Sequence, residues 1–163
     1  MDLTTFKEQI LCFSNKSFRL AKSILKNADK AQDAVQELNA KLWEKKNSLH
    51  EVENMSAFVM RSMRNLCLDT LKQNHTEYEL DEKLEYNEPN PYQYTEKNDT
   101  TNKIHSIIDN LPEIQRNVIR LRDVEGMEIN EIAYIMQMTE NAVNVNLSRA
   151  RLKVRERIKK LIN

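Results

Sequence analysis

The side chains best suited to chemistry gather near the C-terminal end of the chain, in a strongly basic stretch. Residues 141–163 carry seven arginine and lysine side chains against one acid, Glu156, although the whole chain is formally neutral. The segment ENAVNVNLSR at 140–149 adds three asparagines. Asparagine can pair with adenine through two hydrogen bonds, and arginine can do the same with guanine. The composition therefore favours contact with nucleic acid, with a merely solvated basic helix as the alternative.

Helical spacing predicts the elements that would position these side chains. One apolar stripe runs along a long last helix through Val143, Leu147, Ala150, Val154, Ile158 and Leu161. A short helix over 129–136 and a tight turn over 137–139 precede it, with Thr139 as the expected N-cap. Ala133 provides a small residue where the two helices would cross. This is the pattern of a helix-turn-helix, whose second helix enters the major groove.

Two further helices are predicted ahead of that unit. Residues 104–108 are helical in pattern, and the chain breaks at 110–112. A helix then starts with Pro112 at its first position and ends at Gly126, which suits a left-handed C-cap. Residues 103–163 are thus expected to form one small helical domain.

The N-terminal part, residues 1–74, predicts a three-helix bundle. Apolar residues from Phe6 to Ile24 suggest one long first helix, and a second helix follows residues 27–30. The third helix starts after Asn54, with Asn54 or Ser56 as its N-cap. The two cysteines, Cys12 and Cys67, lie in apolar patterns and are expected to be buried free thiols.

An acidic connection, residues 75–102, separates the two helical parts. Residues 76–102 hold two basic and eight acidic side chains, two prolines and no sustained periodicity. Such a composition predicts a flexible linker. The expected fold is all-α, with two small helical domains joined by this flexible acidic linker.

Several classes of function are disfavoured by what the sequence lacks. Gly126 is the one glycine, so glycine-rich phosphate loops are absent. The three histidines (His50, His75 and His105) are isolated from one another, with no partner at metal-ligand spacing. We therefore expect no enzyme, no cofactor, no metal and no small-molecule substrate. No leader-like apolar block opens the sequence and no long apolar run follows, which favours a cytoplasmic protein.

Two motifs in a fixed order resemble the bacterial RNA polymerase sigma factors, in particular their extracytoplasmic-function group. The first is DAVQELNAKLWEKK (33–46) together with AFVMRSMRNLCLDTLKQ (57–73). The second runs from LPEIQRNVIRLRDVEGMEINEIAYIM, which starts at Leu111, into ENAVNVNLSRARLKVRERI. The resemblance covers both helical parts and implies an N-terminal domain over 1–74 and a C-terminal domain over 103–163.

The resemblance assigns three sets of site residues. Contacts to core polymerase fall on Asp33, Gln36, Glu37, Lys41 and Trp43, although a tryptophan is more often a core residue. Contacts to the minus-ten promoter element fall on Asn54, Met55, Arg61, Arg64, Asn65 and Lys72. Contacts to the minus-thirty-five element fall on Asn141, Asn144, Val145, Asn146, Ser148, Arg149 and Arg151.

The function implied by this resemblance is that of a promoter-specificity subunit. Its partners would be core RNA polymerase, promoter DNA and an anti-sigma factor, which in this group is often membrane-anchored. An autonomous helix-turn-helix regulator would explain residues 103–163 but not the motif at 33–46. A helical adaptor for an acidic protein is the third reading.

Overall fold

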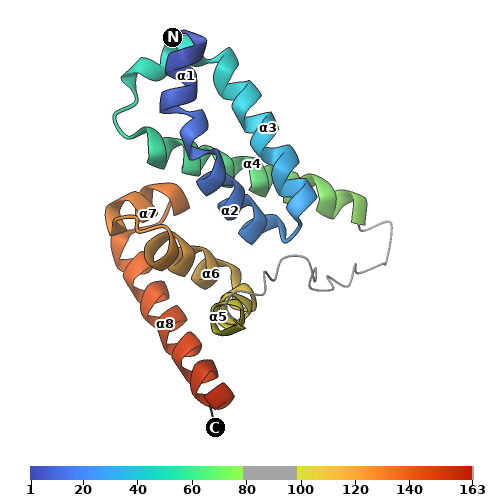
Figure 1. The fold of residues 1–163 in the computed structure, drawn as a ribbon, viewed down its shortest axis with the longest axis vertical. Helices are drawn as coiled ribbons and strands as arrows, with labels where there is room; N and C mark the ends of the chain where they lie inside the picture. The colour runs from blue at the N-terminus through green and yellow to red at the C-terminus, as the bar shows by residue number, and fades with distance from the viewer. Residues whose placement is uncertain (79–98, 163) are drawn as a thin grey trace.

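A computed structural model describes residues 1–78 and 99–162, and all the regular elements within these ranges are helical. Figure 1 shows them as two packed groups, with the helices α1–α4 above and the helices α5–α8 below. The expected all-α fold with two helical domains is confirmed. Residues 79–98, which make up most of the predicted linker, lie outside the described part of the chain.

The N-terminal group is built around α2. It comprises α1 (Leu3–Gln9), a 3-10 turn η1 (Leu11–Phe13), α2 (Ser14–Leu25), α3 (Ala28–Glu44), a second 3-10 turn η2 (Lys46–Glu51) and α4 (Met55–Tyr78). Helix α2 packs against both α3 and α4. The face it buries carries small and aliphatic side chains, including the fully buried Ala21.

Local capping explains where α3 and α4 begin. The Oδ1 atom of Asn27 accepts a hydrogen bond from the Lys30 backbone N–H at 3.0 Å, and Lys26 turns the chain with a left-handed φ of 55°. The Oδ1 atom of Asn54 accepts from the Ala57 backbone N–H, also at 3.0 Å. Of the two candidate caps for α4, the structure therefore selects Asn54 rather than Ser56.

The prediction of one continuous first helix is wrong. The helix stops after Gln9, because Ile10 has φ −123° and ψ −54°, and it resumes as α2 after the turn η1. The break turns α1 so that the Phe6 ring meets Trp43 of α3 edge to face, with ring centroids 5.0 Å apart.

The two cysteines differ, and the expectation that both are buried is wrong for Cys12. Cys67 is buried in α4, and burial raises its pKa to about 12. Cys12 is exposed. It lies in η1, whose three-residue period moves its side chain off the apolar stripe expected from a 3.6-residue period.

The C-terminal group consists of α5 (Asp99–Asp109), α6 (Glu113–Ile119), a π-helical turn η4 (Arg120–Val124), α7 (Ile129–Met136) and α8 (Glu140–Ile162). Pro112 stands just before α6 as its N-cap, one position earlier than predicted. Gly126 adopts the left-handed φ of 72° expected of it. Thr139 caps α8, since its Oγ1 accepts from the Ala142 N–H at 3.1 Å.

Helix α8 extends beyond the other helices of its group (Figure 1). Its inner stripe is buried at Val143, Leu147 and Ala150, but Leu161 is 58% exposed. The expectation that Leu161 lies on the inner side of the domain is therefore wrong, because the last turns have little to pack against. Helices α4 and α5 also reach four residues into each end of the predicted linker, over 75–78 and 99–102.

Candidate nucleic-acid interface

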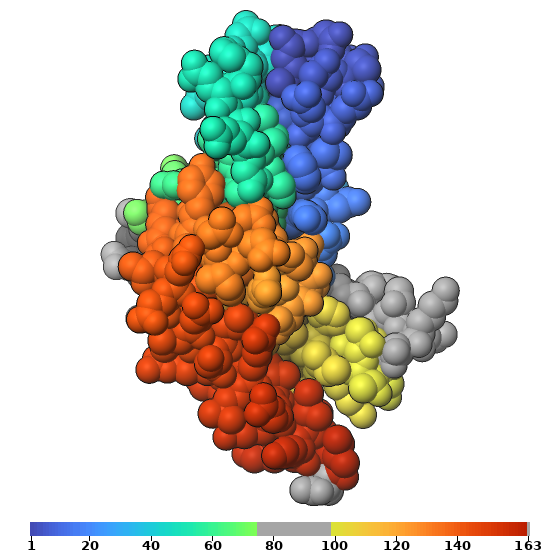
Figure 2. Space-filling model, turned by 90° about the vertical axis from the view of Figure 1, so that its left-hand side faces the viewer, coloured from blue at the N-terminus to red at the C-terminus, as the bar shows by residue number. Residues whose placement is uncertain are grey.

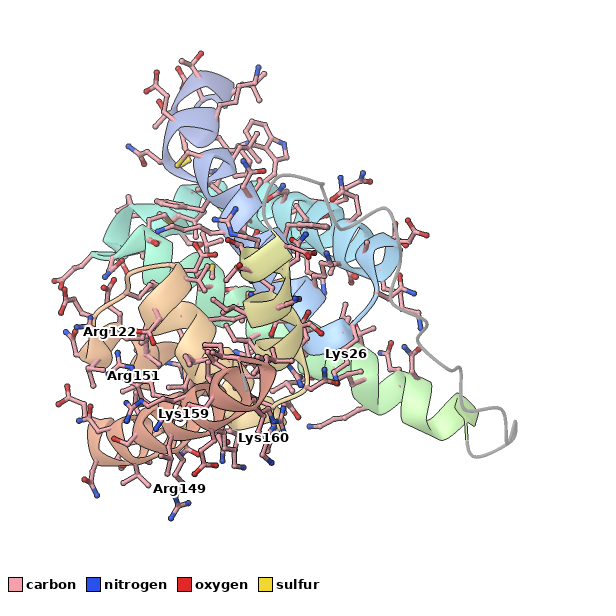
Figure 3. The ribbon with its side chains drawn as sticks, turned by 60° about the horizontal axis from the view of Figure 1, so that its bottom comes forward. Lys26, Arg122, Arg149, Arg151, Lys159 and Lys160 are labelled. Carbon is pink, nitrogen blue, oxygen red and sulfur yellow. The ribbon has the colours of Figure 1, made fainter. Side chains whose placement is uncertain are left out.

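The first turns of α8 present an open polar face. Asn141, Asn144, Val145, Ser148 and Arg149 are all exposed. Figure 3 shows Arg149 pointing away from the rest of the domain, on the same helix as Lys159 and Lys160. The short connection from α7 orients this face, because Gln137 closes α7 with a left-handed φ of 54° and Thr139 starts α8.

Two other residues expected on that face are engaged within the protein. Asn146 is half-buried, and its Nδ2 donates to the Ala142 carbonyl at 2.8 Å. Arg151 binds Asp123 through two hydrogen bonds, of 2.6 and 3.0 Å, and this contact raises the pKa of Arg151. A phosphate would have to compete with Asp123 for that guanidinium.

The residues expected to contact the minus-ten element lie along α4 and its N-cap. Asn54, Asn65 and Lys72 are exposed, whereas Met55, Arg61 and Arg64 are half-buried. Burial lowers the pKa of Arg64, and the carboxylate of Glu113 on α6 offsets part of this effect. All six residues therefore lie on α4 or at its N-cap, but the side chains of three of them are partly covered by neighbouring residues.

Helix α7 supplies that cover. The Nδ2 of Asn54 donates to Oε2 of Glu131 at 2.8 Å, and the Arg61 guanidinium lies 4.5 Å from the centre of the Tyr134 ring. The Glu128 backbone N–H and the Asn54 side chain hold the pKa of Glu131 below its usual range. A pocket of about 370 Å³ opens beside these contacts, between the N-terminal end of α4 and α7.

Sequence reasoning missed Glu131 and Tyr134, and nothing in their local pattern marks them. Their partners lie in the other domain, so the pairing exists only once the two domains pack. Figure 2 shows the C-terminal helices, in orange, lying directly against the N-terminal helices in blue and green. Buried residues of both groups form one continuous apolar cluster.

Polar contacts also cross this domain interface through α2. Arg19 binds the carboxylate of Glu125 through two hydrogen bonds, of 2.5 and 2.9 Å. The Ser23 hydroxyl donates to Oδ1 of Asn117 at 2.7 Å in a fully buried position. The Nδ2 of Asn117 has no partner among the described residues.

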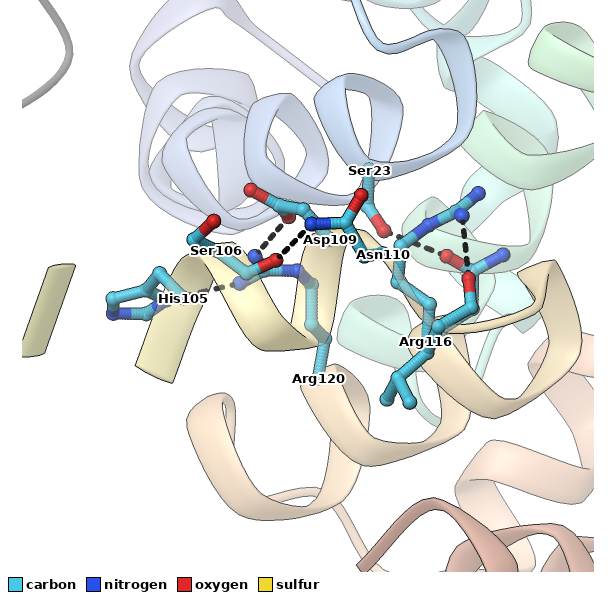
Figure 4. Close-up of polar contacts among 9 residues, drawn as sticks. Ser23, His105, Ser106, Asp109, Asn110, Arg116 and Arg120 are labelled. Carbon is cyan, nitrogen blue, oxygen red and sulfur yellow. Dashed lines mark hydrogen bonds and ion pairs between the residues drawn. The ribbon is translucent and has the colours of Figure 1, made fainter. Parts of the chain in front are cut away.

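Close by, Arg120, the first residue of η4, contacts two side chains of α5 (Figure 4). Its Nη2 donates to Asp109 at 2.5 Å, and its Nη1 lies 3.4 Å from Nδ1 of His105. Burial, and then the positive charge of Arg120, lower the pKa of His105. The neutral imidazole is therefore the form that fits this cluster.

A third candidate face lies on α3, on the far side of its buried stripe. Asp33, Gln36, Glu37 and Lys41 are exposed there, and Glu37 pairs with Lys41 at 3.2 Å. Trp43 is different, because it is half-buried between Phe6 and the Lys46 ammonium, which lies 3.6 Å from the ring centre. Packing within the bundle therefore explains the position of Trp43, and no contact to polymerase is needed to explain it.

No group of three or more histidine, cysteine or acidic side chains is arranged to hold a metal ion within 1–78 and 99–162. In the same ranges, no helix combines the length and apolar character needed to cross a bilayer.

Comparison with known families gives the class of protein. Residues 11–76 match the family described as Sigma-70 region 2, and residues 101–154 match Sigma-70, region 4. The two matches lie in chain order and cover the two helical groups. The chain belongs to the sigma-70 family, and within it to the extracytoplasmic-function group.

Individual relatives agree with that placement. RNA polymerase sigma factor SigV of Bacillus subtilis (strain 168) is 29% identical over 134 residues, which span 82% of this chain and 78% of that protein. The sigma factor RpoE of Bartonella quintana, solved in complex with the anti-sigma factor NepR, superposes with a TM-score of 0.81 at 24% identity, over 96% of this chain and 98% of that one.

A second solved structure, CnrH in complex with the cytosolic domain of CnrY, gives a TM-score of 0.67 at 16% identity, over 98% of this chain and 90% of that one. At these identities the structural likenesses establish the fold. Proteins of the sigma-70 family are transcription initiation factors rather than enzymes.

Proposed function

We propose that this chain directs RNA polymerase to specific promoters and helps to open the DNA duplex there. Core polymerase, promoter DNA and an anti-sigma factor are the proposed partners. In this proposal, residues 1–74 form the domain that docks to polymerase and binds the minus-ten element. Residues 75–102 link it to the domain of residues 103–163, which binds the minus-thirty-five element. The observation that carries the proposal is the presence of two separate exposed faces, one on α3 and one on α8, in one chain of this family.

Docking to polymerase is assigned to the α3 face. Asp33, Gln36, Glu37 and Lys41 are four exposed polar side chains spaced to lie on one side of a helix. Helix α3 contributes none of the polar contacts described between the two domains. A partner helix could therefore reach this face while the two domains remain packed.

Recognition of duplex DNA is assigned to α8. The exposed amides of Asn141 and Asn144 suit adenine, and the exposed guanidinium of Arg149 suits guanine. The basic side chains further along the helix, including Arg155 and Lys159, would contact phosphates and fix the position of the helix in the groove.

The test is transcription from a pooled promoter library by bacterial core polymerase, with and without the full chain. We expect new transcripts that share two upstream elements at a fixed spacing. If the chain added no transcript while the same core responded to another sigma factor, the proposal would fail. A dimer footprint on a palindrome without polymerase would instead support an autonomous regulator.

A further inference from the structure

One basic side chain of α8 differs from the others in what it contacts. Helix α8 carries seven arginine and lysine side chains, and among the described residues Arg151 alone of these pairs with a carboxylate. Its Nη2 donates to Oδ1 of Asp123 at 2.6 Å, and its Nε donates to Oδ2 at 3.0 Å. A two-point contact of this kind is also the geometry in which a guanidinium binds a phosphate.

Helical spacing places Arg151 on the face of α8 that is assigned to DNA. Asn144, Ser148 and Arg151 follow one another at intervals of four and three residues, so their side chains share one side of the helix. Arg155 continues the same row one turn further on. A duplex bound to this face would therefore bring its backbone close to Arg151.

Asp123 is held in place independently of α8. It belongs to the π-helical turn η4, in which Leu121 is buried with 1% of its surface exposed. The neighbouring Arg122 donates from Nη1 to the Met127 carbonyl at 2.8 Å. Because η4 is anchored in this way, the carboxylate of Asp123 cannot follow Arg151 if that side chain turns toward DNA.

Exchanging Asp123 for a phosphate would therefore bring Arg151 little net free energy. The guanidinium would lose two charge-assisted hydrogen bonds and form two of the same kind. The carboxylate of Asp123 would be left as an unpaired negative charge beside negatively charged DNA. Affinity for DNA of any sequence grows with the number of phosphates that basic side chains neutralise. Arg151 is already neutralised within the protein.

We propose that Asp123 withholds Arg151 from the DNA backbone and so lowers the affinity of the chain for duplex DNA of any sequence. Asn144 and Arg149, which are assigned to bases, are exposed and keep their base contacts available. Asp123 thus weakens binding to bulk DNA without touching base readout, and the free chain depends more on polymerase to reach a promoter. The inference rests on the proposed function, because it assumes that α8 lies in the groove.

A double-mutant cycle in DNA binding tests this role. The variants are Asp123→Ala, Arg151→Ala and the two together, all in the full chain. The side chains of Asp123 and Arg151 are 39% and 45% exposed, and an exposed ion pair adds little to stability, so the variants should fold. Each is titrated at several salt concentrations with a fluorescein-labelled duplex of randomised sequence, followed by anisotropy.

We expect Asp123→Ala to bind the randomised duplex about fivefold more tightly than wild type, because the released Arg151 makes one further phosphate contact. The plot of log affinity against log salt concentration should become steeper by about 0.9. Arg151→Ala should change wild-type binding less than about twofold, and the double variant should match Arg151→Ala, because Asp123 acts only through Arg151.

Two further variants serve as controls. Glu156→Ala removes the same charge from an exposed position on α8 itself, and should strengthen binding less than Asp123→Ala does. Asp123→Asn keeps the shape of the side chain and should give a smaller change of the same sign as Asp123→Ala. Circular dichroism confirms that each variant is folded.

Three results would overturn the inference. The first is a loss for Arg151→Ala as large as that for Arg155→Ala, which would mean that Arg151 already binds phosphate in wild type. The second is tighter binding by Asp123→Ala that persists when Arg151 is also replaced. The third is an equal effect of Glu156→Ala, which would reduce the role of Asp123 to general charge.

The proposed function is judged separately, by transcription with core polymerase. A chain that transcribes but shows no coupling between Asp123 and Arg151 keeps its proposed function and loses this inference. A chain that shows the coupling yet never transcribes keeps the role of Asp123 in DNA binding and loses the proposed function.

Discussion

The buried hydrogen bond between Ser23 and Asn117 allows a quantitative test of how firmly the two domains are coupled. Ser23 is 6% exposed and Asn117 is fully buried, so water cannot replace a missing partner. Ser23→Ala leaves Oδ1 of Asn117 without its donor, while Nδ2 already has no partner among the described residues. Stranding a buried acceptor costs about 1–3 kcal/mol, so we expect the free energy of unfolding to fall by that amount.

The double variant Ser23→Ala with Asn117→Leu removes the stranded amide altogether and keeps a side chain of similar shape. We expect it to recover most of the loss, to within about 1 kcal/mol of wild type, because replacing both partners by apolar groups is close to neutral. Urea unfolding followed by circular dichroism, with unchanged m-values, gives both numbers. A loss below about 0.5 kcal/mol for Ser23→Ala, or a double variant less stable than the single one, would refute this account of the interface.

Three further outcomes are expected. Glu37→Lys should abolish comigration with core polymerase while circular dichroism and the thermal transition of the chain stay unchanged, because Glu37 is exposed; unchanged transcription would refute the docking assignment. Arg149→Ala should cost about 1–3 kcal/mol of discrimination at one promoter position, measured by competition binding. The pKa of His105 is lowered in the folded chain, so on acidification the imidazole is protonated in the unfolded chain before it is protonated in the folded one. The free energy of unfolding should therefore fall as the pH drops below the ordinary pKa of 6.5. His105→Gln should flatten urea midpoints measured across that range, and an identical slope in both proteins would count against the cluster around Arg120.

Local signals explain what could be predicted from the sequence. The Asn27, Asn54 and Thr139 side chains each cap a helix through a backbone N–H three residues away, so the pattern is visible within a few residues. Gly126 likewise marks a left-handed position by its own chemistry. Helix order, the helix-turn-helix and the two-domain division follow from such short-range features.

Long-range pairings explain what could not be predicted. Asn54 and Glu131 are 77 residues apart, and Arg19 and Glu125 are 106 apart, so neither pair has a spacing that periodicity can reveal. In the sequence Arg151 looks like an available basic side chain. In the structure it is hydrogen-bonded to Asp123, which lies 28 residues earlier in the chain. The break at Ile10 accompanies a contact between Phe6 and Trp43, which are also far apart in the sequence. The three sets of site residues remain predictions.

The difference between the two cysteines allows the chain to be labelled selectively at one of them. A thiol reacts as its thiolate, and a pKa of about 12 together with burial leaves Cys67 almost without thiolate near neutral pH. An alkylating dye should therefore attach at Cys12 alone. Cys12 lies in the turn between α1 and α2, so the unmodified sequence already carries one attachment point for a fluorophore on its N-terminal domain.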